Sequence, residues 1–363
     1  MDTSDLPTLG WTAELSEAFE AHAAEGFSPA RVGAQHRGSF LIYTEAGELT
    51  AEASGKFRHK AERGMFPAVG DWVAARTSSR PALIEAILPR KSAFTRAGAD
   101  PTRPDSPVEA EVVAANVDLA LVVTSADNDL NLRRLERYLM AGWESGAEPA
   151  VVLTKTDLAE DVPALVASIE AIAPGVEVHA LSNRTGEGVA AVRALIAPGR
   201  TAALIGSSGV GKSSLVNALL GEDRQAVAEV RADGRGRHTT TSRELLLLPG
   251  GGLVLDTPGM RLFTPWDAGA GIEATFADVE ALALECKFSD CGHGNEPGCA
   301  VRAAVEAGTL APDRLESFLK LRRELGHLAR KDDKLAQSVE KRRWAALHRA
   351  GRARIREKRS MDD

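Results

Sequence analysis

Residues 206–213 read Gly-Ser-Ser-Gly-Val-Gly-Lys-Ser and follow the apolar run 202–205. A G-x-x-x-x-G-K-[ST] spacing between a strand and a helix is the pattern of a phosphate-binding loop. Its glycines let the backbone wrap closely, so that backbone N–H groups and the N-terminus of the following helix face phosphate oxygens. The sequence therefore predicts an α/β domain in which consecutive residues bind the phosphates of a nucleotide: Gly206, Ser207, Ser208, Gly209, Val210, Gly211, Lys212, Ser213 and Ser214.

Two side chains of this loop have separate predicted roles. Lys212 contacts the β- and γ-phosphates, and the Ser213 hydroxyl ligates Mg²⁺. Asp256 follows the apolar run 253–255 and begins Asp-Thr-Pro-Gly. At the end of a strand its carboxylate can hold Mg²⁺ through water, while the Gly259 N–H senses the γ-phosphate.

The basic segment 231–245 lies between these motifs and is the expected first switch loop. We predict that Thr240 ligates Mg²⁺ and the γ-phosphate; the threonines on either side of it remain alternatives. Met260 occupies the position where Ras-like enzymes carry a glutamine that orients water, so slow intrinsic hydrolysis is expected. His238 is the nearest candidate for positioning that water, although a histidine in a basic loop is more often solvated or bound to a partner.

Residues 154–157 read Thr-Lys-Thr-Asp and follow the apolar run 149–153. Asp157 can accept hydrogen bonds from both donor groups on the Watson–Crick edge of guanine. Adenine lacks the ring N–H donor and would leave the carboxylate unpaired, a mismatch that such sites reject strongly. The pattern therefore predicts a guanine-reading loop made of Thr154, Lys155, Thr156 and Asp157.

Thr154 stands where such loops usually carry Asn. An Asn amide would bind the base and brace the phosphate loop, whereas a Thr hydroxyl replaces only part of that role, at a loss of about 1 kcal/mol. We expect weaker nucleotide affinity and an unchanged choice of base. After the next apolar run, Ser182 and Asn183 are expected in the backbone loop that caps the base.

The order of these motifs is unusual, because the base-reading loop precedes the phosphate loop. In an ordinary G domain the phosphate loop comes first, followed by the first switch, Asp-x-x-Gly, the base-reading loop and the capping loop. Here each motif occurs once, with the last strands and helices placed first. Joining the old termini between residues 187–199 and 200–206 closes the fold, and domain termini often lie close together. Apolar runs without alternation indicate strands buried on both faces, hence a doubly wound parallel sheet in a circularly permuted G domain.

The segments before and after this domain have different sequence patterns. Short β-like runs separated by turns favour a small barrel of the OB type, and a short amphipathic helix is expected over 9–24. A Pro- and charge-rich stretch is typical of a linker. We predict an N-terminal extension at 1–30, the OB-fold barrel at 31–97, a linker at 98–111, the permuted GTPase domain at 112–268, and a helical zinc-binding domain with a basic tail at 269–363.

All three cysteines lie in the segment 286–299, which has the spacing Cys-x4-Cys-x-His-x5-Cys. An odd number of cysteines clustered in one polar segment suits metal ligation in a reducing compartment better than disulfides. Three thiolates and one imidazole form the ligand set of a closed tetrahedral zinc site, which leaves no position for a catalytic water. We predict one structural zinc ion, besides the Mg²⁺ that accompanies the nucleotide, held by Cys286, Cys291, His293 and Cys299.

Net charge and hydropathy limit the remaining possibilities. A formal net charge of -7 argues against a uniformly basic nucleic-acid binder, although an average can hide local patches of opposite sign. The acidic start lacks the pattern of a signal peptide, and no apolar run approaches the roughly 18 residues that span a bilayer. We expect a cytoplasmic protein with no membrane contact.

Together these motifs resemble the ribosome small-subunit-dependent GTPase A family, also called the RsgA, YjeQ or YloQ family. The resemblance implies a late assembly factor that binds the small ribosomal subunit and its rRNA near the decoding region, hydrolyses GTP when the subunit stimulates it, and then leaves. We expect such a factor to be a monomer. The matching stretches run in order along nearly the whole chain: 114–123, 131–139, 154–158, 206–217, 234–241, 255–261 and 286–308.

Two parts of the chain are candidates for contacting ribosomal RNA, and both contacts would depend on salt. One is the strongly basic tail at 341–359, and the other is a face of the barrel. The segment after Asp256 leads into the cysteine-containing domain, so GTP hydrolysis is expected to swing or release that domain. The basic side chains considered on the barrel are Arg31, Arg37, Lys56, Arg58, Lys60 and Arg63.

Two other functions remain open. An RNA-binding module with a structural nucleotide and no turnover would fit Met260, and hydrolysis assays with and without small subunits separate it from a GTPase. A P-loop ATPase or kinase is opposed by Asp157 and by the lack of a recognisable second-substrate site. Competition between GTP and ATP decides that question.

Overall fold

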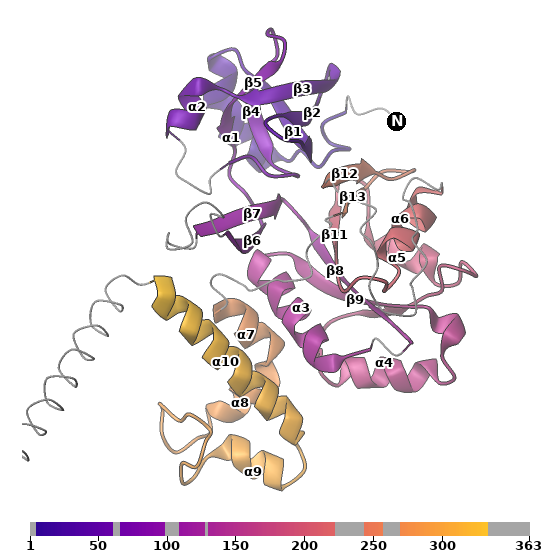
Figure 1. The fold of residues 1–363 in the computed structure, drawn as a ribbon, viewed down its shortest axis with the longest axis vertical. Coiled ribbons are helices and arrows are strands. Elements are labelled where there is room, and N and C mark those ends of the chain that lie inside the picture. Colours follow the sequence, from indigo (N-terminus) through magenta and orange to yellow (C-terminus); the bar gives the residue numbers. More distant parts are fainter. Residues whose placement is uncertain are drawn as a thin grey trace, which may run out of the picture.

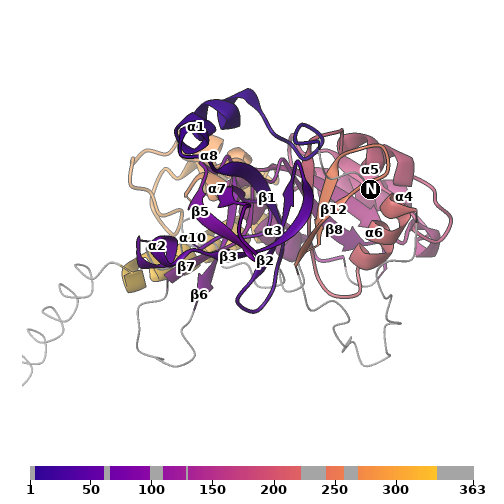
Figure 2. The ribbon, with the colours of Figure 1, turned by 90° about the horizontal axis from the view of Figure 1, so that it is seen from above.

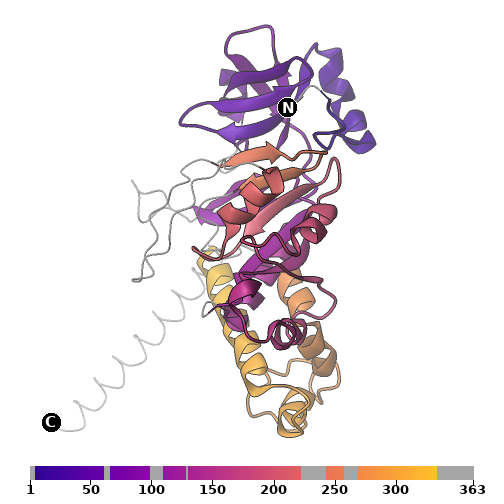
Figure 3. The same cartoon turned by 90° about the vertical axis from the view of Figure 1, so that its right-hand side faces the viewer.

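The computed structural model describes residues 5–60, 66–98, 109–127, 130–221, 243–256 and 269–332, and the structural statements below concern these residues. Figure 1 shows three bodies, which are a barrel, a sheet covered by helices, and a helical domain. Figure 3 shows the same three bodies in a row along the long axis of the molecule.

The barrel contains five strands that close on themselves. Each strand pairs with the next in the order β1-β2-β3-β5-β4, and β4 pairs back with β1. Val32, Ile42 and Ile84 point to the interior and are fully buried. The prediction of a small closed barrel is therefore confirmed. Its elements are β1 (Ser28–Gln35), β2 (Phe40–Thr44), β3 (Gly47–Ala53), α2 (Gly55–Lys60), β4 (Trp72–Arg76) and β5 (Ala82–Ile87).

Helix α1 (Ala13–Ala24) precedes the barrel and begins later than the predicted residue 9. The Thr12 side chain caps it by accepting from the Leu15 N–H, which satisfies one of the free donors of the first turn. The Trp11 ring meets the Trp72 ring edge-on at a centroid distance of 4.8 Å. The segment before β1 thus shares a hydrophobic core with the barrel strands.

A two-stranded antiparallel sheet follows the barrel. It consists of β6 (Ala93–Gly98) and β7 (Glu109–Ala115). In its register Gly98 pairs with Glu109 and Arg96 pairs with Glu111. Both ends of the stretch that the sequence suggested as a linker therefore lie in paired strands.

The central sheet has the strand order β10-β9-β8-β11-β13-β12, in which only β12 is antiparallel to its neighbour β13. If β11 is counted as the first strand, the spatial order reads 6-5-4-1-3-2, and strands 4 to 6 precede strands 1 to 3 in the chain. This is the topology of a circular permutation. The strands are β8 (Leu119–Ser125), β9 (Glu148–Thr154), β10 (Val178–Ala180), β11 (Thr201–Ile205), β12 (Glu244–Leu247) and β13 (Leu253–Asp256).

Helices cover both faces of this sheet. Leu135 of α3 and Ile169 of α4 share one core with Val122, while Val192 of α5 and Leu215 of α6 share a second core with the alternate strand residues. The predicted doubly wound sheet is thus confirmed. Its helices are α3 (Leu132–Ser145), the short 3₁₀ helix η1 (Thr156–Leu158), α4 (Val162–Glu170), α5 (Val189–Leu195) and α6 (Lys212–Leu220).

The barrel and the central sheet meet along β1 and β12, where Ala34 pairs with Glu244. Figure 2, which views the molecule from above, shows these two strands side by side. Arg31 lies at this junction and is only 1% exposed. Its guanidinium donates to the Asn116 carbonyl at 3.2 Å and the Thr201 hydroxyl at 2.8 Å, and it also donates to the Leu9 carbonyl. The prediction that Arg31 contacts RNA phosphate is therefore wrong, because this cation joins three segments inside the protein.

The C-terminal helical domain packs on α3. Phe276 and Phe318 form its core, and Met140 of α3 is part of the same cluster. The backbone N–H of Gly271 donates to Glu144 of α3 at 2.9 Å. None of the described helices is both long and apolar enough to cross a membrane. The helices of this domain are α7 (Gly269–Thr275), α8 (Ala277–Ala283), α9 (Ala300–Glu306) and α10 (Pro312–Asp332).

A buried ionic cluster fixes this domain to α3. Glu136 of α3 is completely buried and accepts from Arg133 at 2.5 Å. From α10 it accepts a bond of 2.6 Å from Arg314 and one of 2.5 Å from Ser317. Arg314 also bonds Asp278 at 2.8 Å. A buried carboxylate needs such partners, because an unpaired one would carry a large desolvation penalty.

Candidate nucleotide and metal sites

The phosphate loop lies where parallel strands end. Strands β8, β9 and β11 are neighbours, and their carboxyl ends form one edge of the sheet, where doubly wound folds bind ligands. Gly206 follows β11 with φ 153°, and a Cβ there would lie 2.2 Å from the Val123 carbonyl oxygen. Only glycine fits that position, so the turn from strand to loop depends on it.

The loop then leads into α6, which starts at Lys212 directly after Gly211. Gly211 has φ 93°, a conformation that favours glycine. The Lys212 ammonium donates to the Gly206 carbonyl at 2.8 Å and also to the Ser207 carbonyl. The cation therefore lies across the loop next to the helix N-terminus, where an anion is favoured. Ser208 is exposed, and Ser213 is half-buried in the first turn of the helix.

The base-reading loop follows β9 at the same edge of the sheet. Lys155 adopts a left-handed backbone with φ 58°, which reverses the chain before η1. Its ammonium pairs with Asp127 at 2.7 Å. Asp157 accepts from the Ser182 hydroxyl at 2.6 Å and pairs with the exposed Arg184 at 2.9 Å.

The Ser182 hydrogen bond is the largest cause that lowers the pKa of Asp157 below its ordinary value, and a backbone hydrogen bond and the charge of Arg184 lower it further. The carboxylate is therefore ionised at neutral pH, which is the form that accepts two hydrogen bonds from guanine. Arg184 is a long side chain that is 75% exposed, so a base can displace it from Asp157 at little cost.

Two side chains connect the base-reading side of the site to the phosphate loop. The hydroxyl of Thr154, which is fully buried, lies 2.5 Å from the Val210 carbonyl oxygen and 3.1 Å from that of Thr124. The Asn183 amide donates to the Gly211 carbonyl at 3.2 Å. The structure thus brings together segments that are far apart in the chain and that the sequence assigned to base and phosphates.

The predicted switch residues remain predictions. His238, Thr240, Gly259 and Met260 lie outside the described residues, as does the basic tail at 341–359. Asp256 ends β13, and its backbone pairs with Glu244. The roles of these residues in holding Mg²⁺ and positioning water are therefore taken up below as proposals.

The zinc-ligand set converges in the C-terminal domain. The ligand atoms of Cys286, Cys291, His293 and Cys299 all lie within 4.8 Å of one another. His293 Nδ1 is 3.7 Å from Cys286 Sγ and 3.5 Å from Cys299 Sγ, and the two sulfur atoms are 3.9 Å apart. Tetrahedral bonds of about 2.3 Å to sulfur and about 2.0 Å to nitrogen place ligand atoms about 3.5 to 3.8 Å apart. The donor set therefore fits a single zinc ion.

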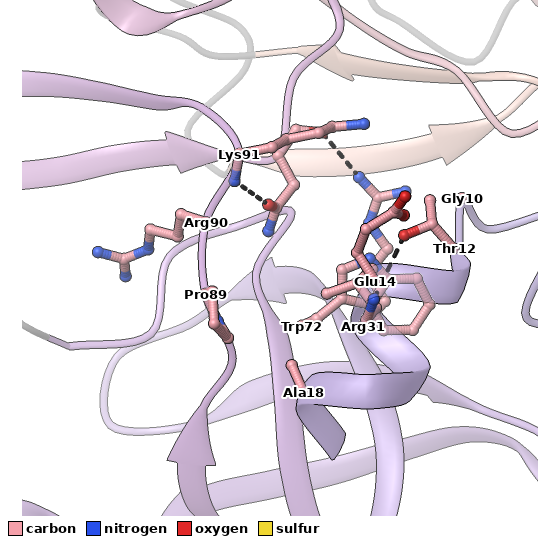
Figure 4. Close-up of a pocket in the computed structure, with 11 residues that line it drawn as sticks. Gly10, Thr12, Glu14, Ala18, Arg31, Trp72, Pro89, Arg90 and Lys91 are labelled. Atoms are coloured by element: carbon pink, nitrogen blue, oxygen red, sulfur yellow. Dashed lines mark hydrogen bonds between the residues drawn. The ribbon is translucent and has the colours of Figure 1, made fainter. Parts of the chain in front are cut away.

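A separate cavity of 410 Å³ lies where α1, the barrel and the central sheet meet. Figure 4 shows Lys91 and Arg90 on one segment of its wall and Trp72 and Arg31 on others. Arg90 pairs with Asp71 at 2.7 Å, so this cation is satisfied within the protein. None of the predicted nucleotide or zinc residues lines the cavity, which is therefore distinct from both sites.

Sequence reasoning missed the side-chain contacts of two residues near the phosphate loop. The Asn183 side chain reaches Gly211, whereas the sequence suggested only a backbone role for its loop. Tyr138 of α3 places its hydroxyl 3.4 Å from the Ser207 hydroxyl. No motif marks either contact, because both depend on how α3 and the capping loop pack on the sheet.

Comparisons with known proteins agree with this geometry. A family model described as RsgA GTPase matches residues 87–266. A protein of Opitutus terrae named small ribosomal subunit biogenesis GTPase RsgA is 45% identical, covering 97% of this chain and 98% of the relative. A protein of Streptomyces coelicolor with the same name is 43% identical, covering 98% of this chain and 96% of the relative.

Two solved structures have a similar fold. The crystal structure of YjeQ from Thermotoga maritima has a TM-score of 0.61 and 28% identity, covering 82% of this chain and 98% of that one. A structure titled as that of YloQ, a circularly permuted GTPase, has a TM-score of 0.58 and 24% identity, covering 83% of this chain and 96% of that one. The family resemblance of the motifs and the permuted fold are both confirmed, and the chain belongs to the RsgA GTPase family.

Proposed function

We propose that this protein hydrolyses GTP on the small ribosomal subunit late in the maturation of that subunit, and that hydrolysis releases it. The relatives that match nearly its whole length are named small ribosomal subunit biogenesis GTPases. The observation that carries the proposal is the meeting of two motifs at one sheet edge. An ionised Asp157 and the Gly206–Lys212 turn lie on loops that Thr154 joins by a hydrogen bond.

Asp157 selects the base in this proposal. Guanine offers a ring N–H and an exocyclic amine to the two carboxylate oxygens, which at present accept from Ser182 and pair with Arg184. Adenine would leave the carboxylate short of a donor, and a site built around a hydrogen-bonding group discriminates strongly against such a ligand. An ATPase or kinase is therefore disfavoured.

Phosphate binding falls to the loop and to α6. Backbone N–H groups at the start of α6 face the phosphates, and Lys212 transfers its bonds from loop carbonyls to phosphate oxygens. Ser213, Thr240 and Asp256 are proposed to hold Mg²⁺, which neutralises charge on the β- and γ-phosphates when it is bound. His238 is proposed to position water, and Met260 accounts for slow turnover without a partner.

The zinc ion has a structural role in this proposal. Four protein ligands fill a tetrahedral site and leave no position for water, so zinc binding holds the segment between α8 and α9 without taking part in hydrolysis. Met140 and Glu136 fix the zinc domain to α3, and Tyr138 of the same helix approaches the phosphate loop. These contacts support a link between the nucleotide state and the position of the zinc domain.

Ribosomal RNA is the proposed binding partner of the basic surfaces of this protein. Arg37, Lys56 and Arg58 are exposed on the barrel, and the basic tail at 341–359 is proposed to add further contacts with phosphate. We propose that the factor acts as a monomer in the cytoplasm. Weaker binding to small subunits at higher salt would support contact with RNA, and salt-insensitive binding would contradict it.

The test of the proposal is GTP turnover measured with purified small subunits, with large subunits and with neither. We expect slow turnover alone and with large subunits, and a marked increase with small subunits. Binding to small subunits without any increase would favour an RNA-binding module in which the nucleotide is structural. Equal competition by ATP for the site would contradict the assignment of guanine.

A further inference from the structure

Asn183 has a side-chain environment that the capping role of its loop does not require. Its Nδ2 donates to the Gly211 carbonyl at 3.2 Å. The Gly211 oxygen can only accept, so the amide nitrogen must face it, and this fixes the orientation of the side chain. The Asn183 Oδ1 atom is then buried and has no hydrogen-bond partner among the described residues. An unpaired buried acceptor is unfavourable, so the contact of the amide nitrogen must be held by the surrounding structure.

Thr154 lies beside this amide. A Cβ placed on Gly211 would lie 3.2 Å from Asn183 Nδ2 and 3.4 Å from Thr154 Oγ1. Both side chains therefore pack against the same side of Gly211. Thr154 contacts the Val210 carbonyl and Asn183 contacts the next carbonyl along the chain. Two consecutive peptide groups of the phosphate loop, directly before Lys212, are therefore held from two different loops.

We propose that Asn183 supplies the amide that the Thr-Lys-Thr-Asp loop lacks, so that Thr154 and Asn183 together do the work of the single Asn usual at that position. Asn183 is thus a positioning residue for GTP, and this inference rests on the proposed function of the site. Asn183 fixes the phosphate loop to the capping loop, and Ser182 of the capping loop bonds Asp157 of the base-reading loop. A nucleotide therefore meets the phosphate loop and the base-reading loop already in place, without first ordering them.

The division of this work between Thr154 and Asn183 leads to a specific prediction. Thr154 has a hydroxyl with one proton and two carbonyl oxygens within reach, so it cannot hold a second loop carbonyl at the same time. Asn at position 154 would provide an amide in the space that Asn183 now occupies. The two amides should therefore substitute for one another, and each should matter only when the other is missing.

The experiment is a double-mutant cycle on nucleotide affinity, with a fluorescent GDP analogue as the probe. Asn183→Ala should weaken binding about 5- to 10-fold, the size expected for one lost hydrogen bond, mainly through faster dissociation. Thr154→Asn in the Asn183→Ala protein should restore affinity to within about twofold of the parent. Glu187→Ala, an exposed change in the same loop, is the matched control and should leave affinity unchanged.

Two further measurements separate positioning from folding. The melting temperature without nucleotide should change little for Asn183→Ala, because the substitution removes the unpaired buried Oδ1 atom together with the hydrogen bond to Gly211. A loss of affinity in a protein of unchanged melting temperature then reports positioning and not folding. Asn183→Asp preserves shape but turns an oxygen toward the Gly211 carbonyl, so it should weaken binding more than Asn183→Ala does. It serves as the second variant if Asn183→Ala folds poorly.

The outcomes distinguish the two proposals. If the parent protein binds GDP but Asn183→Ala changes affinity less than twofold, the role of Asn183 is wrong and the guanine site stands. A loss that Thr154→Asn does not restore also overturns the inference, because the amides would then not be interchangeable. If the parent does not bind the GDP analogue at all, the proposed function itself fails.

Discussion

Replacing Glu136 should loosen the zinc domain from the central sheet. Glu136 is completely buried and accepts hydrogen bonds from Arg133, Arg314 and Ser317. Removing one partner of a buried ion pair costs about 3–5 kcal/mol, because the other charge is left unpaired. Arg314 keeps its bond to Asp278, so we expect Glu136→Ala to cost about 3 kcal/mol. Glu136→Gln keeps an acceptor and should cost about 1 to 2 kcal/mol.

Asp313 offers a matched control. It pairs with Arg133 as Glu136 does, but its side chain is 67% exposed. An exposed ion pair contributes about 0–1 kcal/mol, so Asp313→Ala should change stability by less than about 1 kcal/mol. The comparison isolates the effect of burial, since both carboxylates pair with the same guanidinium.

Native-state hydrogen exchange is the suitable measurement, because unfolding of a chain with several domains need not be two-state. Amides of α3 and α10 should lose about 3 kcal/mol of protection in Glu136→Ala, while amides of the barrel strands should be unaffected. Protection within about 0.5 kcal/mol of the parent in α3 and α10 would refute the reasoning. So would an Asp313→Ala effect as large as that of Glu136→Ala.

Three further predictions follow from the sites. The lowered pKa of Asp157 keeps its carboxylate ionised in acid, so the preference for GDP over ADP should be constant from about pH 8 to about pH 5 and be lost only as the pH falls through that lowered pKa, while titration of the phosphates, with a second pKa of about 6, affects both nucleotides alike; Ser182→Ala should move this loss to higher pH, as a binding titration would show. Cys291→Ser should abolish stoichiometric zinc measured by elemental analysis and unfold the region around α9, because zinc binding supplies roughly 10 kcal/mol of folding free energy; a folded, metal-free parent would contradict this. Arg31→Met should lower the protection of the β1 and β11 amides in native-state hydrogen exchange by about 3 kcal/mol and leave the salt dependence of small-subunit binding unchanged, whereas a reduced salt slope would restore its RNA role.

The doubly wound sheet could be predicted from sequence because its signals are local. Apolar runs such as 119–125 and 201–205 lack alternation, and each is followed by a helical pattern. The permutation was also visible, because each nucleotide motif has its own spacing and the order of the motifs can be read directly. The zinc ligands were predictable for the same reason, since four ligand residues lie within one short segment.

Contacts between distant segments could not be predicted in the same way. Arg31 has the charge of an RNA-binding residue, but the carbonyls of Leu9 and Asn116 that bury it come from other segments and have no sequence signature. Glu136 and Arg314 are likewise unremarkable in sequence, as exposed helices carry many such residues. The contact of the Asn183 amide could not be predicted for the same reason, because its target on the phosphate loop becomes apparent only when β10 and β11 are placed in one sheet.

The central claim is that the Thr-Lys-Thr-Asp loop and the phosphate loop form one guanine nucleotide site in a permuted fold. The most direct measurement is the relative affinity for GDP, ADP and xanthosine diphosphate in the parent and in Asp157→Asn. The parent should prefer GDP over ADP by about 100-fold or more, since two charge-assisted hydrogen bonds depend on Asp157. Asp157→Asn should lose GDP and gain xanthosine diphosphate, whose ring carbonyl accepts from an amide. Equal binding of GDP and ADP by the parent, or GDP affinity unchanged by Asp157→Asn, would contradict the account.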